Sequence, residues 1–70
     1  MRKARMLRAQ KRLSLRDVER EIGVDYTTIS KFEHGALLRE PALRAYAELL
    51  DATIDDLLAQ DTNGASPKGA

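Results

Sequence analysis

The chain has 70 residues and a formal net charge of +1, and 43% of its residues are hydrophobic. This length leaves room for one small domain, which buries only about 60% of its unfolded surface. The absence of cysteine excludes a disulfide framework and a thiolate zinc site, and no apolar run has the length of a signal peptide or a membrane-spanning helix. We therefore expect a soluble, cytoplasmic protein without a membrane partner. Because there are one Phe, two Tyr and no Trp, the core must consist mainly of Leu, Ile, Val and Ala, which favours packed helices.

Charge is distributed unevenly along the chain. Residues 1–35 carry nine Lys and Arg against five Asp and Glu, whereas residues 36–70 carry three against six. Eight basic residues fall within the first twenty positions: Arg2, Lys3, Arg5, Arg8, Lys11, Arg12, Arg16 and Arg20. Such a cluster is either an electrostatic footprint for phosphates or a solvated helix face, and charge alone leaves both open.

The first predicted helix covers residues 2–12, where apolar positions are few. We expect it to lie on the domain through Ala4, Met6 and Leu7, with its arginines in solvent.

A second helix is predicted after Ser14, a suitable N-cap with Asp17 three residues later. Val18 and Ile22 are four residues apart and share its inner face. Gly23 should end this helix, because glycine adopts a left-handed backbone at little cost.

The third helix is predicted from residue 26 to about residue 34, with Asp25 as its cap and Gly35 as its stop. Ile29 and Phe32 face inward. The outward face is polar and consists of Tyr26, Thr27, Ser30 and Lys31. Because only three residues join the second and third helices, the two cross at a steep angle and the third protrudes from the domain.

Two further helices complete the predicted domain, which spans residues 1–60. A fourth starts near Pro41, and its apolar face comprises Leu43, Tyr46, Ala47, Leu49 and Leu50. A fifth starts at Thr53, with Asp56 three residues later, and closes the core with Ile54, Leu57 and Leu58. Residues 61–70 are polar and rich in Gly, Ser and Pro, which predicts a disordered tail.

Several residue types recur at characteristic spacing between Ala4 and Leu58. They are Leu7-Arg8, Leu13-Ser14, Val18, Ile22, Gly23, Val24, Ile29, Phe32, Glu33, Gly35 and the segment 50–58. With these residues the chain resembles the Cro/C1-type (XRE family) helix-turn-helix domain of lambdoid phage repressors and small bacterial regulators. The resemblance implies a compact all-α, lambda-repressor-like fold of five helices, in which the second and third form the helix-turn-helix.

The resemblance also implies roles for particular residues on double-stranded DNA. The start of the third helix would enter the major groove, where Tyr26, Thr27 and Lys31, with Ser30 beside them, would contact bases. Phosphate contacts would come from Arg5, Lys11, Arg12, Arg16, Arg20, Thr28 and Arg39. Structural roles would fall to Ser14, Gly23, Asp25, Gly35, Arg8 and Glu33. Arg8 would pair with Glu33, and a DNA contact of Arg8 is the alternative.

The chain departs from the family at several positions. Leu15 stands where many members have a phosphate-binding Gln, and Glu19 where they have a small residue. Arg12 and Asp51 stand where helices often end in glycine, so either residue is strained if its backbone is left-handed. The loop after Gly35 contains Ala36-Leu37-Leu38 in place of several basic residues, and we expect both leucines to pack inward over the fourth helix, with an exposed patch for a second subunit as the alternative.

Catalytic or metal-binding roles are not indicated. His34 is the single histidine, and without Cys or a second His it has no metal partners. The pair Asp55-Asp56 lies in the first turn of a helix, where acids complement the helix dipole. We therefore expect no enzymatic activity and no cofactor or small-molecule ligand.

We conclude from the sequence that the chain is a sequence-specific transcription regulator, a repressor or an autoregulator. It should bind a palindromic operator as a homodimer, because one small domain contacts few base pairs. Candidate dimer contacts are Leu38, Ile54 and Leu58. The nearly neutral charge leaves an alternative open, a protein-interaction module such as an antitoxin or adaptor with weak DNA binding.

Overall fold

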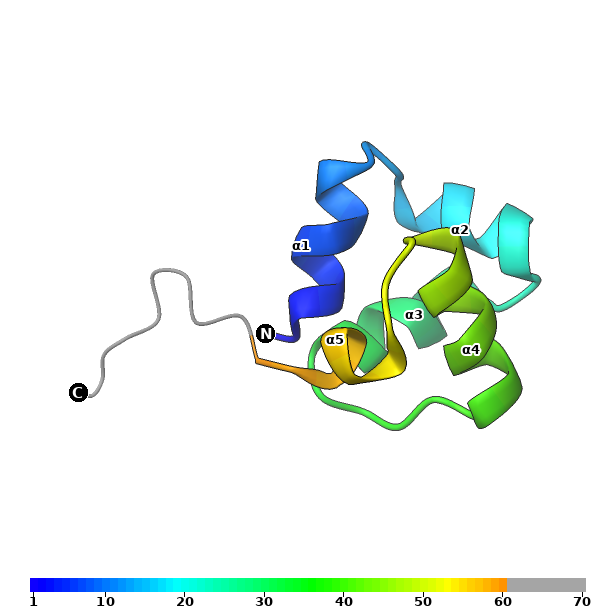
Figure 1. The fold of residues 1–70 in the computed structure, drawn as a ribbon. Helices are drawn as coiled ribbons and strands as arrows, with labels where there is room; N and C mark the ends of the chain where they lie inside the picture. Colours follow the sequence, from blue (N-terminus) through cyan, green and yellow to red (C-terminus); the bar gives the residue numbers. More distant parts are fainter. Residues whose placement is uncertain (61–70) are drawn as a thin grey trace.

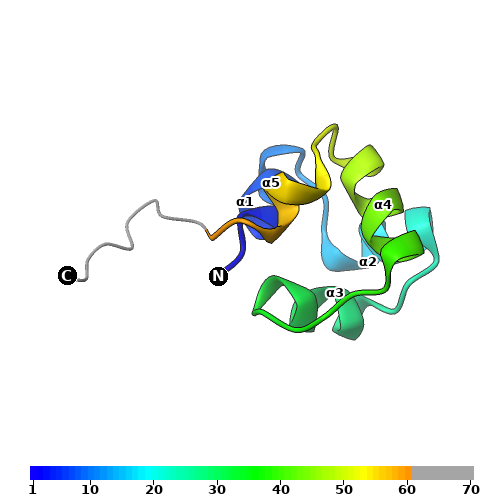
Figure 2. The ribbon, with the colours of Figure 1, turned by 60° about the horizontal axis from the view of Figure 1, so that its bottom comes forward.

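The computed structural model describes residues 1–60, which form five helices packed around one core (Figure 1). They are α1 (Lys3–Gln10), α2 (Leu15–Ile22), α3 (Tyr26–Glu33), α4 (Glu40–Leu49) and α5 (Ile54–Leu58). Figure 2 shows α3 along one edge of the domain, below α1, α4 and α5. The predicted all-α fold of five helices is confirmed. The predicted tail, residues 61–70, lies outside the described part of the chain.

The core draws on all five helices. Its buried members are Ala4, Val18, Ile29, Phe32, Tyr46, Ala47, Leu50 and Leu57. The rings of Phe32 and Tyr46 meet edge to face, with centroids 6.2 Å apart and an interplanar angle of 67°, a favourable arrangement for aromatic quadrupoles. Since Phe32 belongs to α3 and Tyr46 to α4, this contact fixes α3 against the body of the domain.

Capping boxes begin α2 and α5. The Ser14 hydroxyl accepts a hydrogen bond from the Asp17 amide at 3.0 Å, and the Asp17 carboxylate accepts one from the Ser14 amide at 2.8 Å. Thr53 and Asp56 form the same pair of hydrogen bonds at 3.0 and 3.1 Å. Each box satisfies amides that a helix start leaves without intrahelical partners, which explains why α2 and α5 begin where the sequence predicts.

These caps predict a loss of stability in acid. Hydrogen bonds from backbone amides hold the pKa of Asp17 and Asp56 below the usual aspartate value, and the Thr27 hydroxyl does so for Asp25, the cap of α3. A carboxylate whose pKa is lowered by folding contributes stability above its unfolded-state pKa, about 3.9, and this contribution disappears as the pH falls through the folded-state pKa. We expect the free energy of unfolding, measured by urea titration, to fall below about pH 4. The fall should be shallower in the triple variant Asp17→Asn, Asp25→Asn, Asp56→Asn, and equal slopes would contradict this account.

The helices α1, α3 and α4 end in the same backbone motif, in which the residue after the C-cap is left-handed. After α3 this residue is Gly35 (φ 117°), but after α1 and α4 it is Arg12 (φ 59°) and Asp51 (φ 55°). In α1 the amide of Arg12 donates to the Ala9 carbonyl at 2.9 Å and the amide of Leu13 to the Arg8 carbonyl at 3.2 Å, as in a Schellman motif. The motif ends α1 at Gln10, two residues before the predicted boundary.

Replacing Arg12 by glycine should stabilise the domain. A left-handed backbone costs a non-glycine residue roughly 1–2 kcal/mol, and glycine avoids this cost. Part of the gain is cancelled, because glycine also gives the unfolded chain more conformational freedom. We expect Arg12→Gly to raise the free energy of unfolding by about 1 kcal/mol in chemical denaturation. The control is Lys11→Gly, because Lys11 has an ordinary φ of −90° and glycine there should destabilise the domain. A loss of stability in Arg12→Gly would contradict the prediction.

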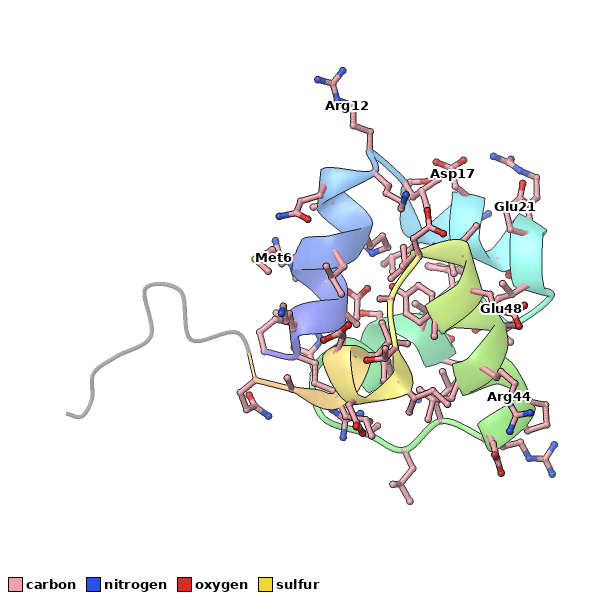
Figure 3. All side chains as sticks on the ribbon, in the orientation of Figure 1. Met6, Arg12, Asp17, Glu21, Arg44 and Glu48 are labelled. Carbon is pink, nitrogen blue, oxygen red and sulfur yellow. The ribbon has the colours of Figure 1, made fainter. Side chains whose placement is uncertain are left out.

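Some hydrophobic residues lie elsewhere than predicted. Leu38 packs against the core, but Leu37 is 92% exposed, so the expectation that both pack inward is wrong for Leu37. The path of the loop turns Leu38 toward the core and Leu37 toward solvent. Met6 is half-buried and lies on the outer side of α1 (Figure 3), and Leu58 is 41% exposed, so neither fills the core as expected.

Candidate nucleic-acid interface

The turn between α2 and α3 places α3 at the surface. Gly23 adopts a left-handed conformation (φ 74°), and its amide donates to the Glu19 carbonyl at 2.8 Å. Val24 is half-buried and packs against the core, and Asp25 then caps α3. Residues 23–25 thus join α2 to α3 through only three residues, and the two helices are in contact. This is the geometry of a helix-turn-helix.

The side chains of α3 divide into a buried and an outer face. Ile29 and Phe32 are completely buried. The four predicted base-contacting residues lie on the remaining surface: Thr27 and Lys31 are exposed, and Tyr26 and Ser30 are half-buried. Only the outer face is therefore accessible to a ligand.

Asp25 fixes the first outward residue of α3. Its carboxylate accepts a hydrogen bond from the Thr27 amide at 3.1 Å and a second from the Thr27 hydroxyl. The hydroxyl proton of Thr27 is thereby used within the protein. The Thr27 side chain can still offer its methyl group and the acceptor capacity of its oxygen to a base edge.

The predicted phosphate-binding residues have different surroundings. Arg16 lies over the ring of Tyr26, with Cζ 4.2 Å from the ring centroid. Arg20 pairs with Asp17, and Lys11 pairs with Asp51 at 3.2 Å, which places Lys11 beside the α4–α5 turn. Exposed side chains are found at Arg5, Arg12, Thr28 and Arg39. The structure thus brings Arg16 to the start of α3, whereas Lys11 faces an acid on another part of the domain.

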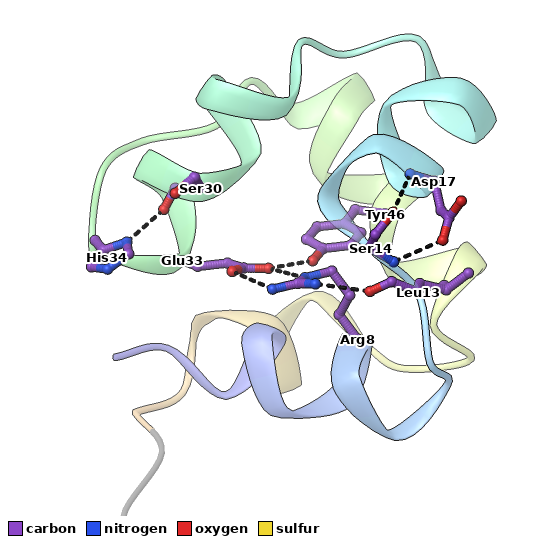
Figure 4. A network of polar contacts seen from close by, with 8 residues as sticks. All are labelled: Arg8, Leu13, Ser14, Asp17, Ser30, Glu33, His34 and Tyr46. Atoms are coloured by element: carbon purple, nitrogen blue, oxygen red, sulfur yellow. Dashed lines mark hydrogen bonds and ion pairs between the residues drawn. The ribbon is translucent and has the colours of Figure 1, made fainter.

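A buried polar cluster ties α3 to α1 and α4 (Figure 4). The Glu33 carboxylate, in a residue only 2% exposed, accepts hydrogen bonds from Arg8 Nε at 2.7 Å and from Arg8 Nη2 at 3.1 Å. The Tyr46 hydroxyl donates to the same carboxylate at 2.8 Å, and Arg8 Nη1 donates to the Leu13 carbonyl at 2.8 Å. The hydrogen bond to Glu33 raises the pKa of Arg8. Burial raises the pKa of Tyr46, and the hydrogen bond to the Glu33 carboxylate raises it further. Arg8 therefore stays charged and Tyr46 neutral at physiological pH.

Arg2 has a role that sequence analysis missed. Its guanidinium lies over the Phe32 ring at 4.5 Å and donates to the carbonyls of Phe32, Gly35 and Ala36 at 3.2, 3.3 and 2.7 Å. The Arg2 amide also donates to the Glu33 carbonyl at 2.8 Å. These carbonyls lie in the last turn of α3 and in the segment that follows it, near the helix C-terminus, where the dipole favours a cation. The sequence analysis counted Arg2 among the basic residues of a possible phosphate footprint. A contact between residues thirty positions apart leaves no local pattern in the sequence.

Residues 1–60 offer little support for other kinds of site. In this range no three His, Cys, Asp or Glu side chains are grouped so that they could hold a metal ion. No helix in the same range is long and apolar enough to cross a membrane.

The protruding α3, the tight turn and the flanking arginines together define the helix-turn-helix class of DNA-binding domains. Comparison by sequence agrees, because the family described as "Helix-turn-helix domain" matches residues 2–60. The chain belongs to this family, consistent with the resemblance to Cro/C1-type domains. Domains of this family are typically DNA-binding modules of regulators and not enzymes. No curated protein and no solved structure matches the chain.

Proposed function

We propose that the chain is a sequence-specific regulator of transcription, a repressor or an autoregulator, that places α3 in the major groove of DNA. The observation that carries this proposal is the division of α3, whose apolar side is buried while Thr27 and Lys31 are exposed on the outer side. Lys31 is suited to donate to guanine O6 or N7, and the Thr27 methyl is suited to contact a thymine methyl. Ser30 and Tyr26 complete the surface that faces the bases.

Phosphate contacts would hold this surface in register without specifying sequence. The proposed set is Arg5, Lys11, Arg12, Arg16, Arg20, Thr28 and Arg39. Arg16 stands at the start of α2, and the exposed Arg39 precedes α4, so these two would flank α3 in the groove. Arg8, whose guanidinium is engaged by Glu33 and Leu13, is left out of this set.

A homodimer would double the contacts that one domain makes. Two copies related by a two-fold axis contact half-sites about 34 Å apart on a palindrome. Leu58, 41% exposed on α5, supports an apolar contact between copies, and Ile54 and Leu38 are further candidates. Sedimentation that finds only monomers, both free and on a palindromic duplex, would reject this part of the proposal.

Selection from a pool of random duplexes tests the function directly. We expect an enriched motif with two-fold symmetry, whose two halves are one helical turn apart. An enriched motif without symmetry would retain specific DNA binding and remove the dimer. No enrichment above the input would remove the proposed function.

The alternative is a protein-interaction module with weak DNA binding, and the 92% exposed Leu37 is the observation that favours it. Salt dependence separates the two functions. Specific binding should weaken steeply with salt, with a slope of about −0.9 for each phosphate neutralised. Affinity for DNA that is low and nearly independent of sequence would favour the interaction module, with Leu37 as the first residue to substitute.

A further inference from the structure

We infer that Tyr26 acts chiefly as a positioning residue for Arg16, and that the two form one unit that binds a single DNA phosphate. This inference rests on the proposed function and narrows the role of Tyr26, which the family resemblance assigns to base contact. Its basis is the stacking of the Arg16 guanidinium on the Tyr26 ring, with Cζ 4.2 Å from the centroid.

The stacked pair joins the first turns of the two motif helices. Arg16 is the second residue of α2 and Tyr26 the first of α3. The Arg16 side chain is exposed, whereas Tyr26 is half-buried. A half-buried ring is a fixed platform, so stacking limits the directions that the longer and more flexible arginine side chain can take.

The donors of Arg16 are free for a ligand. Within residues 1–60, the arginines that form ion pairs or side-chain hydrogen bonds are Arg2, Arg8, Arg20 and Arg44. Arg16 is not among them. The contact places the Arg16 Cζ over the Tyr26 ring, and the Arg16 side chain remains exposed. A planar edge with parallel donors matches two oxygens of one phosphate.

The electrostatic surroundings favour an anion at this edge. Arg16 and Tyr26 belong to the first turns of α2 and α3, and a helix N-terminus carries a partial positive charge. Asp25 is the nearby acid, and Arg16 contributes to lowering its pKa. Because the Asp25 carboxylate already accepts two hydrogen bonds from Thr27, it does not compete fully for the arginine.

The arrangement also explains how the chain compensates for Leu15. A leucine at the first position of α2 cannot donate a hydrogen bond to phosphate. Arg16, one position later, supplies the donors, and Tyr26 supplies the surface that directs them. The aromatic ring of Tyr26 would thus contribute to an electrostatic contact.

A double-mutant cycle on Arg16 and Tyr26 tests the inference. Affinity for the selected duplex and for a scrambled duplex is measured over a range of salt concentrations for wild type, Arg16→Ala, Tyr26→Leu and the double variant. We expect each single variant to weaken both duplexes, by about tenfold for Arg16→Ala, and the double variant to be no weaker than Arg16→Ala. The salt slope should fall by about one in Arg16→Ala, and by a similar amount in Tyr26→Leu although that change removes no charge.

Two further measurements separate positioning from base contact. Tyr26→Phe retains the ring, so its salt slope should equal that of wild type, whereas the slope of Tyr26→Leu should be smaller. Repeating the duplex selection with Tyr26→Leu should return the wild-type motif, because the residue does not choose a base. Circular dichroism of each variant establishes that the fold is kept.

The outcomes are distinguishable from failure of the proposed function. Suppose that wild type enriches a motif. If the losses of binding free energy in Arg16→Ala and Tyr26→Leu are additive, or if Tyr26→Leu changes the base selected at one position, Tyr26 is a base-contacting residue and this inference is wrong. If Tyr26→Phe fails to restore the slope, the hydroxyl and not the ring is what matters, and the inference is again wrong. If wild type enriches no motif, the proposed function itself fails.

Discussion

Replacing Glu33 by alanine should lower the free energy of unfolding by about 3–5 kcal/mol, because it leaves the largely buried Arg8 charge without its partner. The Glu33 carboxylate accepts hydrogen bonds from both Arg8 and Tyr46, so its removal breaks contacts of α3 with α1 and with α4. A domain of this length has a total stability of only several kcal/mol. The variant should therefore be largely unfolded at 37 °C, as measured by circular dichroism and urea titration.

Two companion variants keep this prediction quantitative. Tyr46→Phe removes one hydrogen bond and retains the ion pair, so a smaller loss of about 1 kcal/mol is expected. Glu40→Ala removes an exposed acid that pairs with Arg44 at the surface, and it should cost at most about 0.5 kcal/mol. Comparable stability of Glu33→Ala and Glu40→Ala would show that the buried pair has no special importance.

Replacing Lys31 by alanine should abolish most of the preference for one base pair in each half-site. A direct contact between a side chain and a base edge contributes about 1–3 kcal/mol of discrimination, so affinity for the selected duplex should fall by about fivefold to 150-fold. Affinity for scrambled DNA should change little. Because Lys31 is exposed and lies on the outer face of α3, its removal leaves the core intact.

Arg16→Ala is the matched control, since it removes the same charge from the same surface. It should weaken binding to selected and scrambled duplexes alike and leave the base preference unchanged. Fluorescence anisotropy with both duplexes measures the two quantities. If Lys31→Ala weakens both duplexes equally, Lys31 contacts phosphate and the base assignments on α3 must be revised.

Local features of the sequence predicted most of the fold. Ser14 with Asp17, and Thr53 with Asp56, marked the starts of two helices because a capping box acts within four residues. Gly23 and Gly35 marked helix ends because both backbones are left-handed. In such cases the determining contacts are close in the sequence, so the sequence alone was sufficient.

Contacts between distant residues were harder to predict. The hydrogen bond from Tyr46 to Glu33 and the position of Arg2 on the end of α3 depend on how helices pack, which periodicity does not describe. Leu37 and Leu38 are equally apolar, and only the path of the loop decides which one is buried. The stacking of Arg16 on Tyr26 joins two helices and was likewise missed. Sequence thus predicted which side chains lie on the outer face of α3, but not how they contact their neighbours.

The contacts of Arg2 and Arg16 have a common consequence for α3. Arg2 binds the carbonyls at its C-terminal end, Arg16 stacks on its first residue, and Glu33 in its last turn is held by Arg8 and Tyr46. These contacts fix α3 relative to α1, α2 and α4 before any DNA is present. Less conformational entropy then remains to be lost on association. If α3 enters the major groove as proposed, this preorganisation would add to the affinity that the phosphate contacts provide.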